Sequence, residues 1–159
     1  IHSAHTVLAR LEARFVRPVA RVDGGPVSAR VEGHAGSVGD TAALQIVVEN
    51  TSAAAVKRPV VEVMLPAPAR LSAAAIAGME RAAGVERVEP PDAQGLVRIQ
   101  LSALESRQRL RLPLPVRWIG AGTVRGLSTT AHDADRPWRI SSRPSRAIEL
   151  EARRKETWR

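Results

Sequence analysis

The stretch LPAPARLSAAAIAGMERAAGVERVEP, residues 65–90, decides how this chain folds. On both sides of it apolar and polar residues alternate, which is typical of half-buried β-strands. Inside it a strand ends at Leu65-Pro66, and an alanine-rich segment follows that is long enough for about three helical turns. Valines then return at positions 85 and 88. The stretch therefore predicts one helix inserted between two strands.

The helix is predicted to cover about residues 72–83. Ser72 suits its N-cap, because the hydroxyl can accept a hydrogen bond from a free backbone amide. Gly84 suits the C′ position, where a left-handed backbone ends many helices. One apolar stripe is predicted along the helix, formed by Ile76, Met79 and Ala83. Because this stripe is thin, we expect packing against the strands to hold the helix in place.

Short segments with strand-like alternation continue outward from the helix in both directions. Turn sequences such as DGGP (23–26) and GSVGD (36–40) separate them. The segments are AALQIVVEN (42–50), VVEVML (60–65), GLVRIQL (95–101), RQRLRLPLPVRW (107–118), GTVRGLSTTA (122–131) and RAIELEA (146–152). Such a series, about seven short strands, predicts an all-β fold, an antiparallel immunoglobulin-like sandwich with one inserted helix.

Two prolines in the longest predicted strand indicate its place in a sheet. Pro113 and Pro115 are two residues apart, so their missing N–H groups lie on the same side of the strand. That side cannot donate to a neighbouring strand over those positions. We therefore expect a sheet edge there, blocked against further pairing.

The formal net charge is +8, and only two of the 24 basic residues, Lys57 and Lys155, are lysines. One interpretation is a polyanion-binding stripe on the outward face of a hairpin, formed by Arg98, Arg107, Arg109, Arg111 and Arg117. We favour ordinary solvated faces, because the arginines are spread along the chain and aromatic stacking partners are scarce. This disfavours nucleic acid as a partner.

The sequence has no cysteine, which excludes disulfides and thiolate chemistry, and no apolar run of the ~20 residues that a membrane span needs. It lacks an initiator methionine and a signal-like leader, so we expect a section of a longer polypeptide. Residues 1–14 are expected to be a lead-in, either the end of a preceding domain's helix or an extended strand. The sandwich is expected over 15–151, followed by a charged tail, 152–159.

From about residue 15 to residue 150 the chain resembles the C-terminal receptor-binding-type domain of the alpha-macroglobulins, which are thioester-containing protease traps. The matching segments follow the family's order. They are ARFVRPVARVDGGP, VGDTAALQIVVEN, PVVEVMLPAPA, LSAAAIAGMERAAGVERVE, GLVRIQLSAL, RLRLPLPVRW and GLSTTAHDADRPW. The resemblance implies a macroglobulin β-sandwich with one helix after a strand that ends in Leu-Pro.

The resemblance also implies site residues. In bacterial relatives this domain shields the thioester with a tyrosine from the segment that is AHDADRPW here, but this chain has no tyrosine. Either His132 or Trp138 substitutes for it, or the parent protein lacks a working thioester. The implied interdomain and shielding candidates are His132, Asp133, Asp135, Arg136 and Trp138. The bond itself would need a cysteine and a glutamine from another domain.

In animal members, lysines on the helix contact an endocytic receptor. Ala73 and Ala77 occupy the corresponding places here, so that binding is not expected. The remaining candidates for an interaction on the helix face are Arg70, Met79 and Arg81.

Three further motifs have a simpler interpretation than a functional one. HDAD (132–135) offers metal-ligand types, but turn chemistry is favoured, and no metal or cofactor is expected. Asn50-Thr51-Ser52 matches the glycosylation pattern, yet a turn after a strand is favoured. For Trp138, packing is favoured over an exposed contact.

No nucleophile elbow or scaffolded carboxylate pair is present, so an enzyme is not expected.

The predicted function is that of a non-catalytic domain of an alpha-macroglobulin-like protease trap, which packs on neighbouring domains and moves when the bait segment is cleaved. Its partners would be domains of the same parent chain and, indirectly, proteases. The resemblance implies an extracytoplasmic location. The alternatives are an immunoglobulin-like spacer or a polyanion-binding module of a cell-surface protein.

Overall fold

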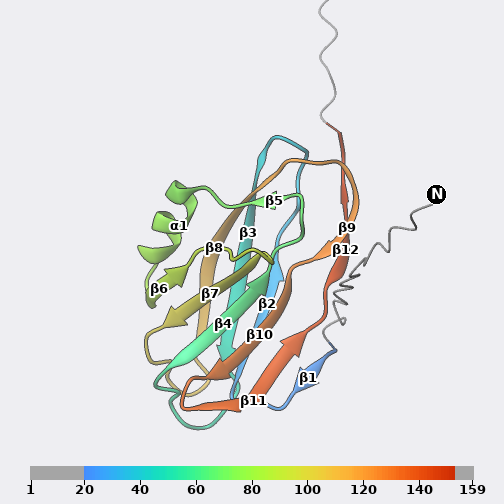
Figure 1. Cartoon of the computed structure of the whole chain (residues 1–159). Helices are drawn as coiled ribbons and strands as arrows, with labels where there is room; N and C mark the ends of the chain where they lie inside the picture. Colours follow the sequence, from blue (N-terminus) through green and yellow to red (C-terminus); the bar gives the residue numbers. More distant parts are fainter. Residues whose placement is uncertain (1–19, 153–159) are drawn as a thin grey trace, which may run out of the picture.

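The computed structural model describes residues 20–152, which form two packed sheets, a smaller strand pair and one helix (Figure 1). The six-stranded sheet has the order β1 (Val22–Asp23), β11 (Arg136–Arg143), β10 (Ser128–Asp133), β4 (Pro59–Met64), β7 (Leu96–Leu101) and β6 (Val85–Glu89). The four-stranded sheet has the order β2 (Val27–Glu32), β3 (Thr41–Asn50), β8 (Arg109–Trp118) and β5 (Ala69–Arg70). The pair is β12 (Arg146–Leu150) with β9 (Gly122–Gly126). The predicted all-β sandwich is confirmed.

The core lies between the two large sheets and follows the predicted alternation. Along β8 the inward positions Leu112, Leu114, Val116 and Trp118 are all buried. Trp118 is completely buried, and its indole Nε1 donates to the carbonyl oxygen of Ala35 at 2.5 Å. This bond satisfies the one polar atom that the side chain brings into the core.

The two prolines of β8 lie at an unpaired side of the strand, as predicted. On one side β8 pairs with β3 from Arg109 to Arg117. On the other side β5 pairs only with Arg117 and Trp118, beyond both prolines. The edge is therefore open along most of β8 and closed only at its C-terminal end.

Helix α1 (Ala73–Glu80) begins as predicted but ends three residues earlier. The Ser72 hydroxyl accepts from the amide of Ala75 at 3.1 Å. Pairing of β6 with β7 forces the early end, because Ser102 already donates to the Gly84 carbonyl oxygen. Gly84 has the expected positive φ of 82°, but it lies in the turn before β6 and not at C′. Consequently Ala83 is exposed, and its neighbour Ala82 packs against the core instead.

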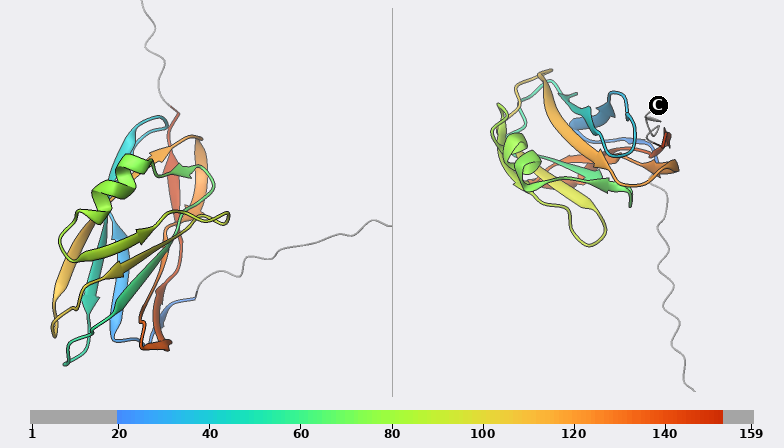
Figure 2. Two further views of the ribbon diagram at one scale, coloured as in Figure 1. Left: turned by 60° about the vertical axis from the view of Figure 1, so that its left-hand side comes forward. Right: turned by 90° about the horizontal axis from the view of Figure 1, so that it is seen from above.

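The helix covers the side of the sandwich where β6 and β8 lie at the edges of different sheets (Figures 1 and 2). Met79 is its only buried side chain, with 1% of its surface exposed. Ile76 is half-buried against the same core. The helix is therefore held by a few contacts across the gap between the sheets, and its side chains close that side of the core. Among the described residues, no helix combines the length and apolar character needed to cross a membrane.

Asn50, the last residue of β3, joins the loop that follows β3 to the loop between β7 and β8. Asn50 is completely buried, and its amide nitrogen donates to the carbonyl oxygens of Ala54, Leu104 and Glu105 at 2.8–3.1 Å. Its side-chain oxygen accepts from the amide and the hydroxyl of Ser52. Such a side chain has no room for a glycan, so the turn interpretation of the Asn-Thr-Ser pattern is correct.

The expected boundaries at 14 and 15 lie outside the described residues, as do all but Ala152 of the expected charged tail.

Substitution Gly78→Ala tests the helix. Gly78 lies inside α1 with nothing within 4 Å of an added Cβ, so the alanine meets no clash. We expect the free energy of unfolding to rise by about 0.5–1 kcal/mol, because glycine loses more backbone freedom in a helix. Chemical denaturation measures this; an unchanged or lower stability would contradict the helical assignment.

Substitution Asn50→Ala tests the buried amide. It should lower the free energy of unfolding by about 3 kcal/mol or more, since three carbonyl groups lose their donor in a buried site. Ser52→Ala is the control and should cost about 1 kcal/mol, because one hydroxyl is lost at the loop surface. Equal effects of the two substitutions would show that Asn50 does not join the loops.

Candidate functional site

The β10–β11 hairpin carries the five residues predicted for interdomain contact. Asp133 pairs with Arg136 across a tight turn, and the Asp133 carboxylate accepts from the amide of Asp135 at 3.1 Å. Asp135 forms an exposed ion pair with Arg58 at 3.1 Å, and the Arg58 carbonyl oxygen accepts from the amide of Ala134. Both aspartates therefore belong to the turn, which agrees with the interpretation of HDAD as turn chemistry. Within residues 20–152, no three acidic or histidine side chains are arranged to hold a metal.

The structure places Trp138 at the surface, so the expectation that it packs is wrong. Its exposed fraction is 75%, the largest of any apolar side chain described as exposed. The cause is an irregular register: β10 moves from Ala131 to Asp133 while β11 moves from Ser141 to Arg136. The intervening residues of β11 leave the ladder, and Trp138 lies on this bulged segment. An alternating pattern in the sequence gives no sign of such a bulge.

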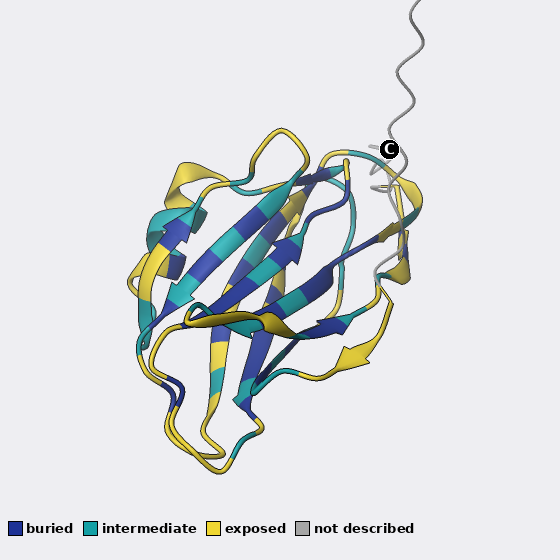
Figure 3. Cartoon of the chain, turned by 60° about the horizontal axis from the view of Figure 1, so that its bottom comes forward, coloured by how far each residue is buried: buried dark blue, intermediate teal, exposed yellow. Residues whose placement is uncertain are grey.

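His132 lies in different surroundings from Asp135, Arg136 and Trp138. It is half-buried and lies opposite Val60 on β4, whereas the neighbouring Ala131 belongs to the core. Its side chain thus faces the outer surface of the six-stranded sheet. Asp135, Arg136 and Trp138 are exposed together at the hairpin end, in a region where exposed residues gather on the loops (Figure 3). A cleft of about 350 Å³ beside the turn is lined by Lys57, Asp133, Asp135, Arg136 and Arg139, among others.

The three candidates near the helix do not form one face. Met79 points into the core and is closed to any partner in this structure. Arg81 is the exposed C-cap of α1. Arg70 lies on β5, where its Nη1 donates to the carbonyl oxygens of Ala67 and Ala69 at 2.6 and 2.8 Å. The structure therefore separates residues that the sequence grouped by their place along the chain.

The predicted basic stripe is not one surface. Arg98 lies on β7 of the six-stranded sheet, whereas Arg109, Arg111 and Arg117 lie on β8 of the other sheet. The segments β7 and β8 are thus no hairpin, and the connection between them crosses from sheet to sheet. Arg107 lies in that connection and donates to the carbonyl oxygen of Thr51.

Carboxylates partner most of these arginines. Arg98 pairs with Glu62 and Glu89, and these two partners raise its pKa above the ordinary value. Arg109 pairs with Glu49, and Arg111 pairs with Glu32. A polyanion would have to compete with these partners for the guanidinium groups.

On the outward face of the four-stranded sheet, two arginines flank a buried apolar residue. Val47 lies between Arg30 on β2 and Arg111 on β8, directly opposite both. Although it is on the outer face, Val47 is only 1% exposed. Glu32 bonds both arginines, and this pairing lowers its pKa. The arginine stems thus cover an apolar residue while their charged ends stay in water.

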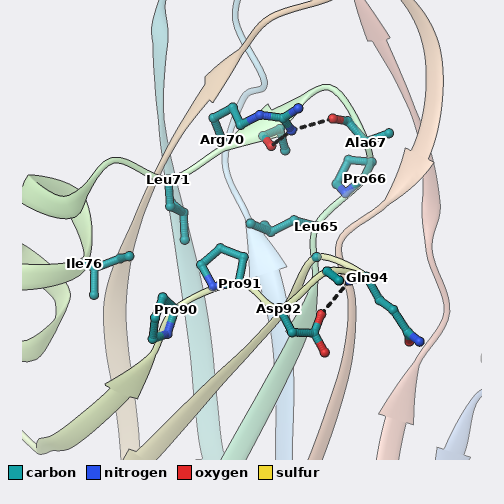
Figure 4. A pocket seen from close by; sticks show the side chains of 13 residues that line it. Leu65, Pro66, Ala67, Arg70, Leu71, Ile76, Pro90, Pro91, Asp92 and Gln94 are labelled. Atoms are coloured by element: carbon teal, nitrogen blue, oxygen red, sulfur yellow. Dashed lines mark hydrogen bonds between the residues drawn. The ribbon is translucent and has the colours of Figure 1, made fainter.

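A pocket that the sequence did not predict lies beside the start of α1. This helix-side pocket encloses about 620 Å³ between the β4–β5 connection, the helix and the β6–β7 loop (Figure 4). Its walls include Leu65, Pro66, Leu71, Ile76, Pro90 and Pro91, with Arg70, Asp92 and Gln94 among the polar lining residues. The signal available in the sequence was the proline content of the two connections, which indicates rigid loops but not their proximity.

Asp92 shapes the loop on one side of this pocket. Its Oδ1 accepts from the amides of Gln94 and Leu96 at 2.8 and 2.9 Å. These bonds to the charged form lower the pKa of the carboxyl group below its ordinary value of 3.8. The carboxylate therefore holds the turn and stays ionised.

The pH dependence of an Asp92→Asn variant tests this assignment. A depressed pKa means that the charge contributes stability above the unfolded value of 3.8, and that the contribution is lost as the pH falls through the folded value. We therefore expect the variant to have a lower Tm than the original chain near neutral pH, with the difference disappearing in acid. Thermal unfolding across pH measures it; a difference independent of pH would contradict the assignment.

No protein-family model matches the sequence. No curated protein matches it either. Solved structures of bacterial alpha-2-macroglobulins do match the fold. The trypsin-activated protein from Escherichia coli matches with a TM-score of 0.61 and 13% identity, over 84% of this chain and 11% of that chain.

Two further structures agree with this match. The native Escherichia coli protein spanning the residues from domain MG7 to the C-terminus gives a TM-score of 0.57 and 12% identity, over 84% of this chain and 24% of that chain. The Salmonella protein reacted with methylamine gives a TM-score of 0.58 and 12% identity, over 84% of this chain and 9% of that chain. The chain thus spans about a quarter or less of each structure. It has the β-sandwich fold of a domain of bacterial alpha-2-macroglobulins, as the resemblance in its sequence predicted.

Proposed function

We propose that this chain is a non-catalytic domain of an alpha-macroglobulin-like protein, located outside the cytoplasm, that packs on other domains of the same parent chain. The observation that carries the proposal is the fold match, which covers 84% of this chain in structures of a much larger protein. One of those structures begins at domain MG7 and continues to the C-terminus. The domain that this chain resembles is therefore found in the C-terminal part of that protein.

The proposed movement is that of a rigid body. The fold matches a native structure with a TM-score of 0.57 and protease-activated structures with 0.61 and 0.59. Similar scores for both states support a domain that keeps its fold while the parent changes shape. Bait cleavage by a protease would then change the neighbours of the domain and leave its core unchanged.

The proposed contact with the neighbouring domain is the hairpin end that carries Asp135, Arg136 and Trp138. Tryptophan and arginine are the residues that most often carry the binding energy of an interface. An exposed tryptophan on a bulge between Arg136 and Arg139 has this composition. In a thioester-containing parent, Trp138 would supply the aromatic side chain that shields the bond. The half-buried His132 is the weaker candidate for that role.

The ion pairs on both sheets favour this proposal over polyanion binding. Arg98, Arg109 and Arg111 each have a carboxylate partner, so they offer less free charge than the sequence suggests.

The test uses the intact parent protein, treated with methylamine and separately with trypsin. We expect an amine adduct by mass and a smaller hydrodynamic radius after cleavage. Substitution Trp138→Ala should speed amine incorporation by about tenfold or more, because a buried aromatic contact is lost. Ile119→Ala is the matched control, since Ile119 is also an exposed large apolar residue and lies outside the hairpin.

The outcomes separate the steps of the proposal. Compaction without an adduct would support a trap that closes physically and would reject shielding of a thioester. An adduct rate unchanged by Trp138→Ala would reject the hairpin end as the shield. If neither an adduct nor compaction is observed, the macroglobulin mechanism is overturned, and the remaining function is that of a spacer domain.

A further inference from the structure

The helix-side pocket is large enough to hold a peptide side chain, and its lining mixes apolar and polar residues. Its volume of about 620 Å³ lies within the range of pockets that hold small ligands or peptide side chains. Prolines at positions 66, 90 and 91 contribute to its walls. A proline ring has little conformational freedom to lose, so these walls are already ordered before anything binds.

Arg70 lines this pocket, and a second arginine, Arg117, lies next to it on the neighbouring strand. Arg70 on β5 lies directly opposite Arg117 on β8, and both side chains are exposed. Opposite positions in a ladder face the same side, and like charges placed there repel. Among residues 20–152 neither arginine forms an ion pair.

This lack of a partner sets Arg70 and Arg117 apart from the rest of their sheet. Arg30, Arg109 and Arg111 on the same sheet each pair with a glutamate. Two bonds to backbone carbonyl oxygens fix the guanidinium of Arg70 over the β4–β5 connection. Arg70 therefore places a positioned positive charge at the pocket, with Arg117 opposite it on β8.

The two ends of the pocket carry opposite charges. In the view of Figure 4, Arg70 lies at one end and Asp92 at the other, with Leu65 and Pro91 between them. Asp92 is ionised, since its backbone bonds lower its pKa. An anionic group would be repelled at the Asp92 end and attracted at the Arg70 end.

We propose that the helix-side pocket binds an extended peptide segment of a partner protein in which an apolar side chain lies next to a carboxylate. The apolar side chain fills the space between Leu65, Leu71 and Pro91. The carboxylate lies between Arg70 and Arg117, where it replaces the repulsion of two like charges with two charge-assisted contacts. This site is independent of the proposed macroglobulin function and of the hairpin end.

The probe is the peptide acetyl-Ser-Asp-Leu-Asp-Ser-amide, titrated into the isotopically labelled 159-residue chain and followed by NMR. Expected are saturable shifts of amides in the β4–β5 connection, the start of α1 and the β6–β7 loop. The double variant Arg70→Gln, Arg117→Gln should weaken binding by about tenfold, the effect of losing charged contacts. The control variant Arg109→Gln, Arg111→Gln carries the same charge change on the same sheet and should bind as the original chain does.

Two control peptides separate specific from general attraction. In one, asparagine replaces both aspartates; in the other, glycine replaces the leucine. Both should bind about tenfold more weakly. Full affinity of the glycine peptide would mean that the arginines attract any polyanion, and would overturn the peptide assignment. Absence of saturable shifts with the first peptide, or equal weakening by both double variants, would overturn the site itself.

Discussion

The sandwich depends on closing the side where β6 and β8 face each other from different sheets. Neither strand can pair across that gap, and Pro113 and Pro115 remove the donors that a further strand on β8 would need. An apolar side chain that is not in a strand has to fill the space, and Met79 on α1 does so with 1% exposure. The helix is therefore part of the core's boundary, which explains why a β-rich domain contains one.

Hydrogen bonds of buried polar side chains also join distant parts of the domain. Asn50 donates to the carbonyl oxygens of Leu104 and Glu105, which lie 54 and 55 residues further along the sequence. Thr129 on β10 donates to the carbonyl oxygen of Ala29 on β2 at 2.6 Å, inside the sandwich. Every buried side-chain polar atom of the described residues has a partner. These bonds fix how the two sheets sit on each other, because each bond satisfies only one arrangement of the strands.

The net charge of +8 has no single function in this structure. Arg30 and Arg111 cover Val47, and Arg98 joins Glu62 to Glu89. Within the described part of the chain, Arg70 and Arg117 lie opposite each other beside the helix-side pocket without an ion pair, and the exposed Trp138 lies on a separate hairpin. Two surfaces of different chemistry thus remain available for contacts: the hairpin end comes from one continuous segment, whereas the helix-side pocket combines segments distant in sequence.

The sequence by itself determined most of the central elements of this domain. Alternation predicted β3, β4, β7, β8 and β12, Ser72 the start of the helix, and two prolines the unpaired side of β8, because each is a local property of the backbone. It indicated no segment for β2 or β11, and it joined β9 and β10, which the structure places in different sheets. The site was a different matter. The bulge that exposes Trp138 is a mismatch between two strands, and the sheet that holds Arg98 is set by a crossing connection. The helix-side pocket needs two loops about 25 residues apart to meet. Only the tertiary structure decided these, because they depend on long-range pairing that no local pattern encodes.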